Sequence, residues 1–357
     1  MLFFFSSLEE LYSSPQYDSG SVINIVRFDQ MLFSVNEDNF DDKWISWNNT
    51  LDSVPFYYFK DHVGMDMNPD SLKHYILTFI DFPEVLQYKL AIDHEFKDLK
   101  AIEITFNKVF DRYKEFLPNI MVPKSIITLP FHGLVDTYKG NLLVGLNNYL
   151  SEADPHFYSI YQYQRYRSDR RFLIMDGMEY WFTNAFLDRN QDRDKTFLDH
   201  LIFKGKIMYL MNKCYPSADL SDIMRYSQED MDWCESNEFN IWNEVIGINI
   251  MYDYNYDNFR TFFNPAPFTN RMPEESPGRL GYWIGYKIIS SYMKNNQITI
   301  PQLLLNVESQ RIFLESEYKP DNDHRFEDDV SIFIKYWWFI FALLFVLCIM
   351  YLYYLKK

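Results

Sequence analysis

Cysteine is scarce in this sequence, with three in 357 residues. Cys348 falls in a hydrophobic stretch near the C-terminus, which leaves Cys214 and Cys234 in the rest of the chain. Two thiols are too few for a disulfide framework or for a four-cysteine zinc site. One bridge between them remains open in an oxidising compartment, but their spacing alone favours two free thiols.

Basic residues and glycine are also few. The chain has 34 Lys and Arg against 50 Asp and Glu, which gives a net charge of −16. This balance argues against nucleic-acid binding, because phosphate contacts need clustered Lys and Arg. The 11 glycines form neither a glycine-rich phosphate loop nor a GxSxG motif. The usual sequence signals of nucleotide binding and of serine-hydrolase chemistry are therefore missing.

Apolar and aromatic residues are abundant instead. They make up 48% and 19% of the chain, respectively. That is enough apolar surface to build a substantial core, so global disorder is not expected. The length fits one large domain or two ordinary ones.

The longest hydrophobic run lies at the C-terminus. Tyr336–Leu355 is 20 residues without a charge, about the length that crosses the hydrocarbon core of a bilayer. Aromatic residues at both ends of the run, and Lys335, Lys356 and Lys357 beside it, suit the two interfaces. The sequence predicts a single transmembrane helix over 336–355, with the lipid bilayer as its partner, preceded by an acidic linker over 321–335.

The body of the chain reads as one mostly helical α+β domain over residues 21–320, after a flexible segment over 1–20. Ser21–Val35 suggests a strand leading into a helix, and 40–117 repeats apolar residues at helical spacing. Two β-like runs, Lys124–His132 and Asn141–Leu150, are joined by a glycine-bounded connection that suits a hairpin. Helical patterns then dominate from 155 onwards.

A metal site is not expected, although one motif begins like a zinc peptidase. His94 and Glu95 open an HExxH pattern, but Asp98 stands where the second histidine is needed. The helix expected over 171–182 carries Asp176 and Glu179 and no histidine. These two carboxylates are the one candidate acid–base pair, and nothing in the sequence places a nucleophile beside them.

The helix predicted to begin at Thr196 carries the remaining candidate ligand, His200. It has no second imidazole to coordinate with, and Lys204 stands where a ligand carboxylate would be wanted. A cation repels a divalent metal ion. We therefore expect no metal ligand, no cofactor and no identified catalytic residue.

Several long segments resemble the gliding motility-associated lipoprotein GldB family of Bacteroidota. They occur in family order over roughly residues 100–320 and include LLVGLNNYLSE, FLDHLIFKGKIMYLMNKCYPSADLSDIMRYSQ, FFNPAPF and ESPGRLGYWIGYKIISSYMKNN. The resemblance implies a zincin-like, metallopeptidase-type domain with a small sheet, in a family many of whose members lack HExxH. This sequence departs from the pattern in having no N-terminal lipobox cysteine, a C-terminal hydrophobic run, and Lys204 where relatives often have Glu.

The resemblance favours a membrane-anchored protein of the cell envelope, with its domain in the periplasm. We expect a pseudo-peptidase of the gliding motility or secretion type, which binds an unidentified protein or peptide partner in a degenerate peptidase cleft. The candidate binding residues are His200, Lys204, Arg279, Tyr282 and Tyr286. Two alternatives stay open: a hydrolase with an unrecognised site built from Asp176, Glu179 and His200, and a structural spacer.

Overall fold

The computed structural model describes residues 22–152, 154–186, 195–306 and 308–320. A four-stranded sheet lies in the N-terminal half, with the strands in the order β1-β2-β4-β3. Their bounds are Asn24–Val26 (β1), Ser125–Leu129 (β2), Val135–Tyr138 (β3) and Asn141–Gly145 (β4). β1, β2 and β4 run parallel, and β3 pairs antiparallel to β4 at one edge.

The hairpin predicted between the two β-like runs is wrong. β2 and β4 pair in parallel, with Ile127 opposite Leu143, and the connection between them contains the additional strand β3. The real hairpin joins β3 to β4 through Lys139 and Gly140, whose φ angles are 49° and 82°. Positive φ at both central residues is the geometry of a tight two-residue hairpin turn, which glycine adopts without strain.

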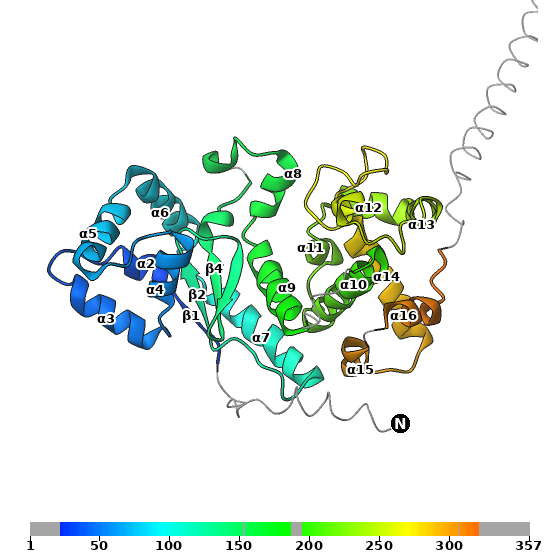
Figure 1. The fold of residues 1–357 in the computed structure, drawn as a ribbon, viewed down its shortest axis with the longest axis horizontal. Coiled ribbons are helices and arrows are strands. Elements are labelled where there is room, and N and C mark those ends of the chain that lie inside the picture. The colour runs from blue at the N-terminus through cyan, green and yellow to red at the C-terminus, as the bar shows by residue number, and fades with distance from the viewer. Residues whose placement is uncertain (1–21, 153, 187–194, 307, 321–357) are drawn as a thin grey trace, which may run out of the picture.

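Both faces of the sheet are covered. Alternate residues of β2 and β4 belong to two separate apolar clusters, one on each face. The first face packs against the N-terminal helices on the left of Figure 1. These are α2 (Phe28–Leu32), α3 (Phe40–Thr50), α4 (Val54–Tyr57), the π-helical turn η1 (Tyr58–His62) and α5 (Pro69–Ile80).

The second face packs against α7 (Lys100–Phe116) and α9 (Phe172–Phe186). Gly177 lets these two helices approach each other, because a Cβ there would stand 2.9 Å from the ring of Phe106. α6 (Pro83–Glu95) closes the end of this layer. The helical region predicted over residues 40–117 is confirmed, as is the strand leading into a helix before it.

Beyond α9, helices α10 (Phe197–Cys214) and α14 (Leu280–Asn295) form the centre of the C-terminal half (Figure 1). They cross at Gly205 and Gly285, where an added Cβ would meet the backbone of the other helix at 2.2 Å. The smaller helices around them are α11 (Leu220–Met224), α12 (Gln228–Ser236), α13 (Glu238–Gly247), α15 (Ile300–Leu305) and α16 (Ser309–Ser316), while the short α8 (Gln162–Arg165) lies above α9 in Figure 1.

Local signals read from the sequence are confirmed in this half. Thr196 caps α10, and its hydroxyl accepts the backbone N–H of Asp199, while the Asp199 carboxylate accepts from the N–H of Thr196. Ser227 begins α12 in the same reciprocal way. Cys214 and Cys234 are free and buried, as their spacing favoured.

One part of the predicted fold class, the transmembrane helix, is contradicted. Among the described residues, no helix is long and apolar enough to cross a bilayer. The longest of them, α10, carries four charged residues, Asp199, Lys204, Lys206 and Lys213, which a spanning segment does not tolerate. The predicted transmembrane helix is therefore not supported, and 336–355 lies outside the described residues, as do 1–20 and 321–335. What stands is a mostly helical α+β domain with a small mixed sheet.

Candidate functional site

Two carboxylates stand on one side of α9, which packs beside the sheet. Asp176 and Glu179 are three residues apart, so they share a helix face. The side chain of Asp176 is 6% exposed and that of Glu179 is 14% exposed. Carboxylates this far from water need partners, because burying an unpaired charge is costly.

Arg225 supplies the main partner to both carboxylates. Its Nη2 lies 2.8 Å from Asp176 Oδ1 and 2.9 Å from Glu179 Oε2, and its side chain is fully buried. The residue ends α11 in the left-handed conformation, with φ 57°. A non-glycine residue adopts that conformation at a cost, which the surrounding contacts must offset.

Arg279 reaches Glu179 from the other side. It precedes α14 with φ 66°, again left-handed, and its Nη2 lies 3.5 Å from Glu179 Oε2. Its guanidinium packs on the ring of Tyr282, 3.9 Å from the centroid, and the Tyr282 hydroxyl donates to Glu179 Oε1 at 3.0 Å. Lys204 of α10 completes this group, with Nζ 3.4 Å from Glu179 Oε1.

Asp176 has a further set of neighbours. The hydroxyl of Tyr149 donates to its Oδ2 at 3.0 Å, and Nη2 of Arg167 lies 3.7 Å from its Oδ1. The Nε of Arg167 is buried and has no hydrogen-bond partner among the described residues. We call Arg167, Asp176, Glu179, Lys204, Arg225 and Arg279 the ion cluster. It holds four cations and two carboxylates.

Neighbouring charges and burial shift the pKa of three members of the ion cluster, Glu179, Lys204 and Arg167. Burial alone would raise the pKa of Glu179, but Arg225, Lys204 and Arg279 outweigh it and hold that pKa far below its usual range. Burial alone would lower the pKa of Lys204, but Glu179 and Tyr282 raise it. Burial lowers the pKa of Arg167 to about 10. At neutral pH Glu179 is therefore a carboxylate surrounded by cations.

Three pockets adjoin one another at this site, and the ion cluster lines two of them. One pocket, about 330 Å³, is bounded by Asp176, Glu179 and Lys204 on one side and by Leu134 and Val135 of the sheet edge on the other. A smaller one of about 90 Å³ contains Arg225 and Arg279. Arg167 lines both and connects them.

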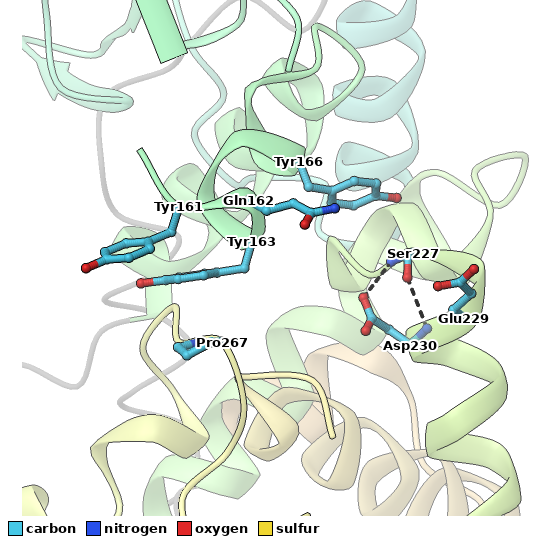
Figure 2. A pocket seen from close by; sticks show the side chains of 8 residues that line it. All are labelled: Tyr161, Gln162, Tyr163, Tyr166, Ser227, Glu229, Asp230 and Pro267. Atoms are coloured by element: carbon cyan, nitrogen blue, oxygen red, sulfur yellow. Dashed lines mark hydrogen bonds between the residues drawn. The ribbon is translucent and has the colours of Figure 1, made fainter. Parts of the chain in front are cut away.

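The third pocket is a wide surface hollow of about 850 Å³ (Figure 2). The rings of Tyr161 and Tyr163 lie nearly parallel in it, with centroids 5.9 Å apart. Tyr161 is 73% exposed, so its ring is available to a partner. This hollow shares four lining residues with the smaller pocket, namely Tyr163, Tyr166, Asp230 and Pro267. We call the three pockets together the groove.

The structure brings together some of the candidate residues and separates others. Lys204, Arg279 and Tyr282 meet Asp176 and Glu179 in the ion cluster or beside it. Arg279 is buried, and its charge is paired with Glu179.

Two of the candidate residues lie apart from the ion cluster. The ring of His200 packs among Tyr256, Phe259 and Phe263, at centroid distances of 5.4 to 5.7 Å. The ring of Tyr286 lies 6.3 Å from that of Tyr209. Among the described residues, no hydrogen bond or ion pair joins His200 to Asp176 or Glu179, and the hydrolase alternative built on these three residues stays a prediction.

Three residues of the site were missed in the sequence. Arg167, Arg225 and Tyr149 belong to short or irregular segments whose patterns give no sign of what they face. Asp222 and Glu229, at i − 3 and i + 4 from Arg225, could each have been taken for its partner, so nothing in the pattern pointed to Asp176.

The fold and the site together define a helical α+β domain with a covered mixed sheet and a buried ion cluster beside the sheet edge. The family model described as gliding motility protein GldB matches residues 14–320. The chain belongs to the GldB family. No curated protein and no solved structure matches it.

Proposed function

We propose that this chain is a non-catalytic, membrane-associated protein of the cell envelope, acting in gliding motility or secretion, which binds a peptide segment of a protein partner in the groove. Membership of the gliding motility family supports the location and the process. The observation that carries the non-catalytic part is the charge environment of Glu179, whose carboxylate contacts Arg225, Lys204 and Arg279 together.

A catalytic carboxylate must either exchange a proton near the working pH or offer a lone pair to a metal ion. Glu179 is poorly suited to both tasks. Its pKa is far below its usual range, so it does not carry a proton to donate. Its Oε1 faces Lys204 and the hydroxyl of Tyr282, and its Oε2 faces two guanidinium groups. A divalent cation at that place would be repelled by the surrounding charges.

The same cluster suits an anionic group on a ligand. Four cations face two carboxylates, so two positive charges are left over, and a carboxylate from a partner would neutralise one of them. Arg167 is the most suitable contact, because it lines two adjoining pockets and its Nε lacks a hydrogen-bond partner among the described residues. Arginine binds carboxylates through paired, directional hydrogen bonds.

The two ends of the groove suit an extended peptide. At one end, β3 is the edge strand and Val135 lines the pocket, so a peptide backbone could pair with it as an added strand. At the other end, the exposed ring of Tyr161 offers apolar contact area at low entropic cost (Figure 2). A partner segment with an acidic side chain between apolar ones would match all three pockets.

The test uses the purified full chain and fluorescent nine-residue peptide pools with one fixed position. Pools that fix Asp or Glu are compared with pools that fix Asn or Gln, and binding is followed by anisotropy. We expect the acidic pools to bind selectively, and Arg167→Gln to abolish that preference. The matched control, Arg311→Gln, changes a 60% exposed arginine on α16 and should leave binding unchanged.

Three outcomes would count against the proposal. Equal binding of acidic and amide pools would remove the role of the ion cluster. An equal loss in the Arg311→Gln control would show that only general surface charge matters. No selective binding of any pool would favour the spacer alternative.

A further inference from the structure

A second group of ionisable side chains lies at the sheet edge, outside the ion cluster. His62 ends the π-helical turn η1, His132 follows β2, and Asp136 lies on β3. We propose that His62, His132 and Asp136 bind a divalent transition-metal ion. The sequence predicted no metal ligand, and this site goes beyond the proposed function because peptide binding in the groove does not require it.

The three side chains already stand close to a coordinating arrangement. Their ligand atoms all lie within 4.8 Å of one another. Nε2 of His62 is 3.2 Å from Asp136 Oδ2, and the two imidazole centroids are 4.0 Å apart. Ligands of a tetrahedral zinc ion at about 2.0–2.2 Å are separated by roughly 3.4 Å. Side-chain rotations that move the donor atoms by about 1 Å would therefore place all three on one ion.

The state of His132 is the independent observation that points to a ligand. Both of its ring nitrogens are buried, and neither has a hydrogen-bond partner among the described residues. Buried polar atoms in native proteins are almost always satisfied, and an exception asks for a bound water or ion. A metal ion within the triad would provide that partner.

The groups around the triad are arranged as they are around known metal ligands. The hydroxyl of Tyr57 donates to Asp136 Oδ2 at 2.7 Å, and that of Tyr180 donates to Oδ1 at 2.8 Å. Hydrogen bonds of this kind orient a ligating carboxylate.

The backbone of His132 is also held in place. Its N–H donates to Asn147 Oδ1 at 3.1 Å, and its carbonyl accepts from Asn148 Nδ2 at 2.9 Å. The loop that carries this histidine is thereby fixed against the end of β4. A ligand on a fixed loop needs little reordering when an ion binds.

The donor set indicates the kind of ion. Two imidazoles and one carboxylate suit Zn²⁺ and neighbouring first-row divalent ions, whereas Mg²⁺ and Ca²⁺ prefer oxygen ligands alone. The side chains of His62 and Asp136 are 26% and 20% exposed, so the ion has a path from solvent. Three protein ligands leave a coordination position for water or a partner's side chain.

The test uses the full chain, purified without a histidine tag and freed of metal by chelator dialysis. Zinc binding is measured by calorimetry and by competition with a chromophoric chelator, and cobalt absorption reports the coordination geometry. We expect one ion per chain, and at least a hundredfold weaker binding in His132→Ala. Tyr57→Phe should weaken binding about tenfold, because it frees the Asp136 carboxylate.

Two controls keep the result interpretable. His62→Gln removes a partly exposed ligand and should also lose binding, while circular dichroism confirms that the variant is folded. His74→Gln changes an exposed histidine of α5 outside the triad and should bind as the wild type does. Zinc binding that is absent, or that survives His132→Ala and His62→Gln, would overturn the proposal. An adventitious surface ion would show the second pattern.

Discussion

The substitution Glu179→Gln tests the electrostatic description of the ion cluster. It keeps the size of the side chain and an acceptor for the Tyr282 hydroxyl, but it removes the negative charge that faces Arg225, Arg279 and Lys204. Breaking a buried ion pair on one side costs about 3–5 kcal/mol, because the remaining charge is left uncompensated. We expect a loss in that range, from a total stability on the order of 5–15 kcal/mol.

Urea titrations of the full chain, followed by circular dichroism and by tryptophan fluorescence, measure this loss. Arg225→Met alone should also destabilise, and the double variant should lose less than the sum of the two, because the Arg225–Glu179 pair is then removed on both sides. Asp176, Arg279 and Lys204 still lose a partner in the double variant, so part of the loss remains. Glu315→Gln breaks the exposed pair with Arg311 on α16 and should have little effect. A loss below about 1 kcal/mol for Glu179→Gln, or strict additivity with Arg225→Met, would show that Glu179 is not a buried counter-charge to these cations.

Three further predictions follow from the packing and the charges. Gly205→Ala should lower the free energy of unfolding by about 1–3 kcal/mol or more in a urea titration, since its Cβ would lie 2.2 Å from Gly285 O. In the control Gly247→Ala, the added Cβ meets nothing within 4 Å, so the free energy of unfolding should not change. Thr196→Ala should cost about 1 kcal/mol in the same assay through loss of the α10 cap. In the folded chain the pKa of Glu179 is lowered, so as pH falls below about 4.3 only the unfolded chain binds a proton at this carboxylate. The free energy of unfolding should therefore drop by about 1.4 kcal/mol per pH unit in that range. Glu179→Gln should lack that component of the slope in urea titrations between about pH 5 and pH 3.

Much of the fold could be predicted because its signals are local. Apolar spacing located the helices before residue 117, and Thr196 marked the start of α10. The pairing of the sheet could not be predicted in the same way. β2 and β4 have the composition of hairpin strands, but their parallel pairing depends on β3 filling the edge and on helices covering both faces.

The site was only half predictable, for a related reason. Glu179 stood out as half of a carboxylate pair, and Lys204 because it occupies a position where a metal ligand would be wanted. Arg279 stood out as a charged residue in an apolar segment, which usually has a partner. Arg225 and His62 gave no such sign. Arg225 reaches Asp176 across 49 positions, and His62 meets Asp136 across 74. Contacts of that kind arise from tertiary packing, which a single sequence pattern does not record.

We propose that the groove binds a peptide without cleaving it. Mass spectrometry of the acidic peptide pools, after prolonged incubation with the full chain at their binding concentration, tests this directly. We expect the peptides retained by the protein to be recovered intact, and retention to fall in Arg167→Gln. Recovery of cleaved fragments that disappear in Glu179→Gln would contradict it, because a carboxylate held by three cations would then be acting in catalysis.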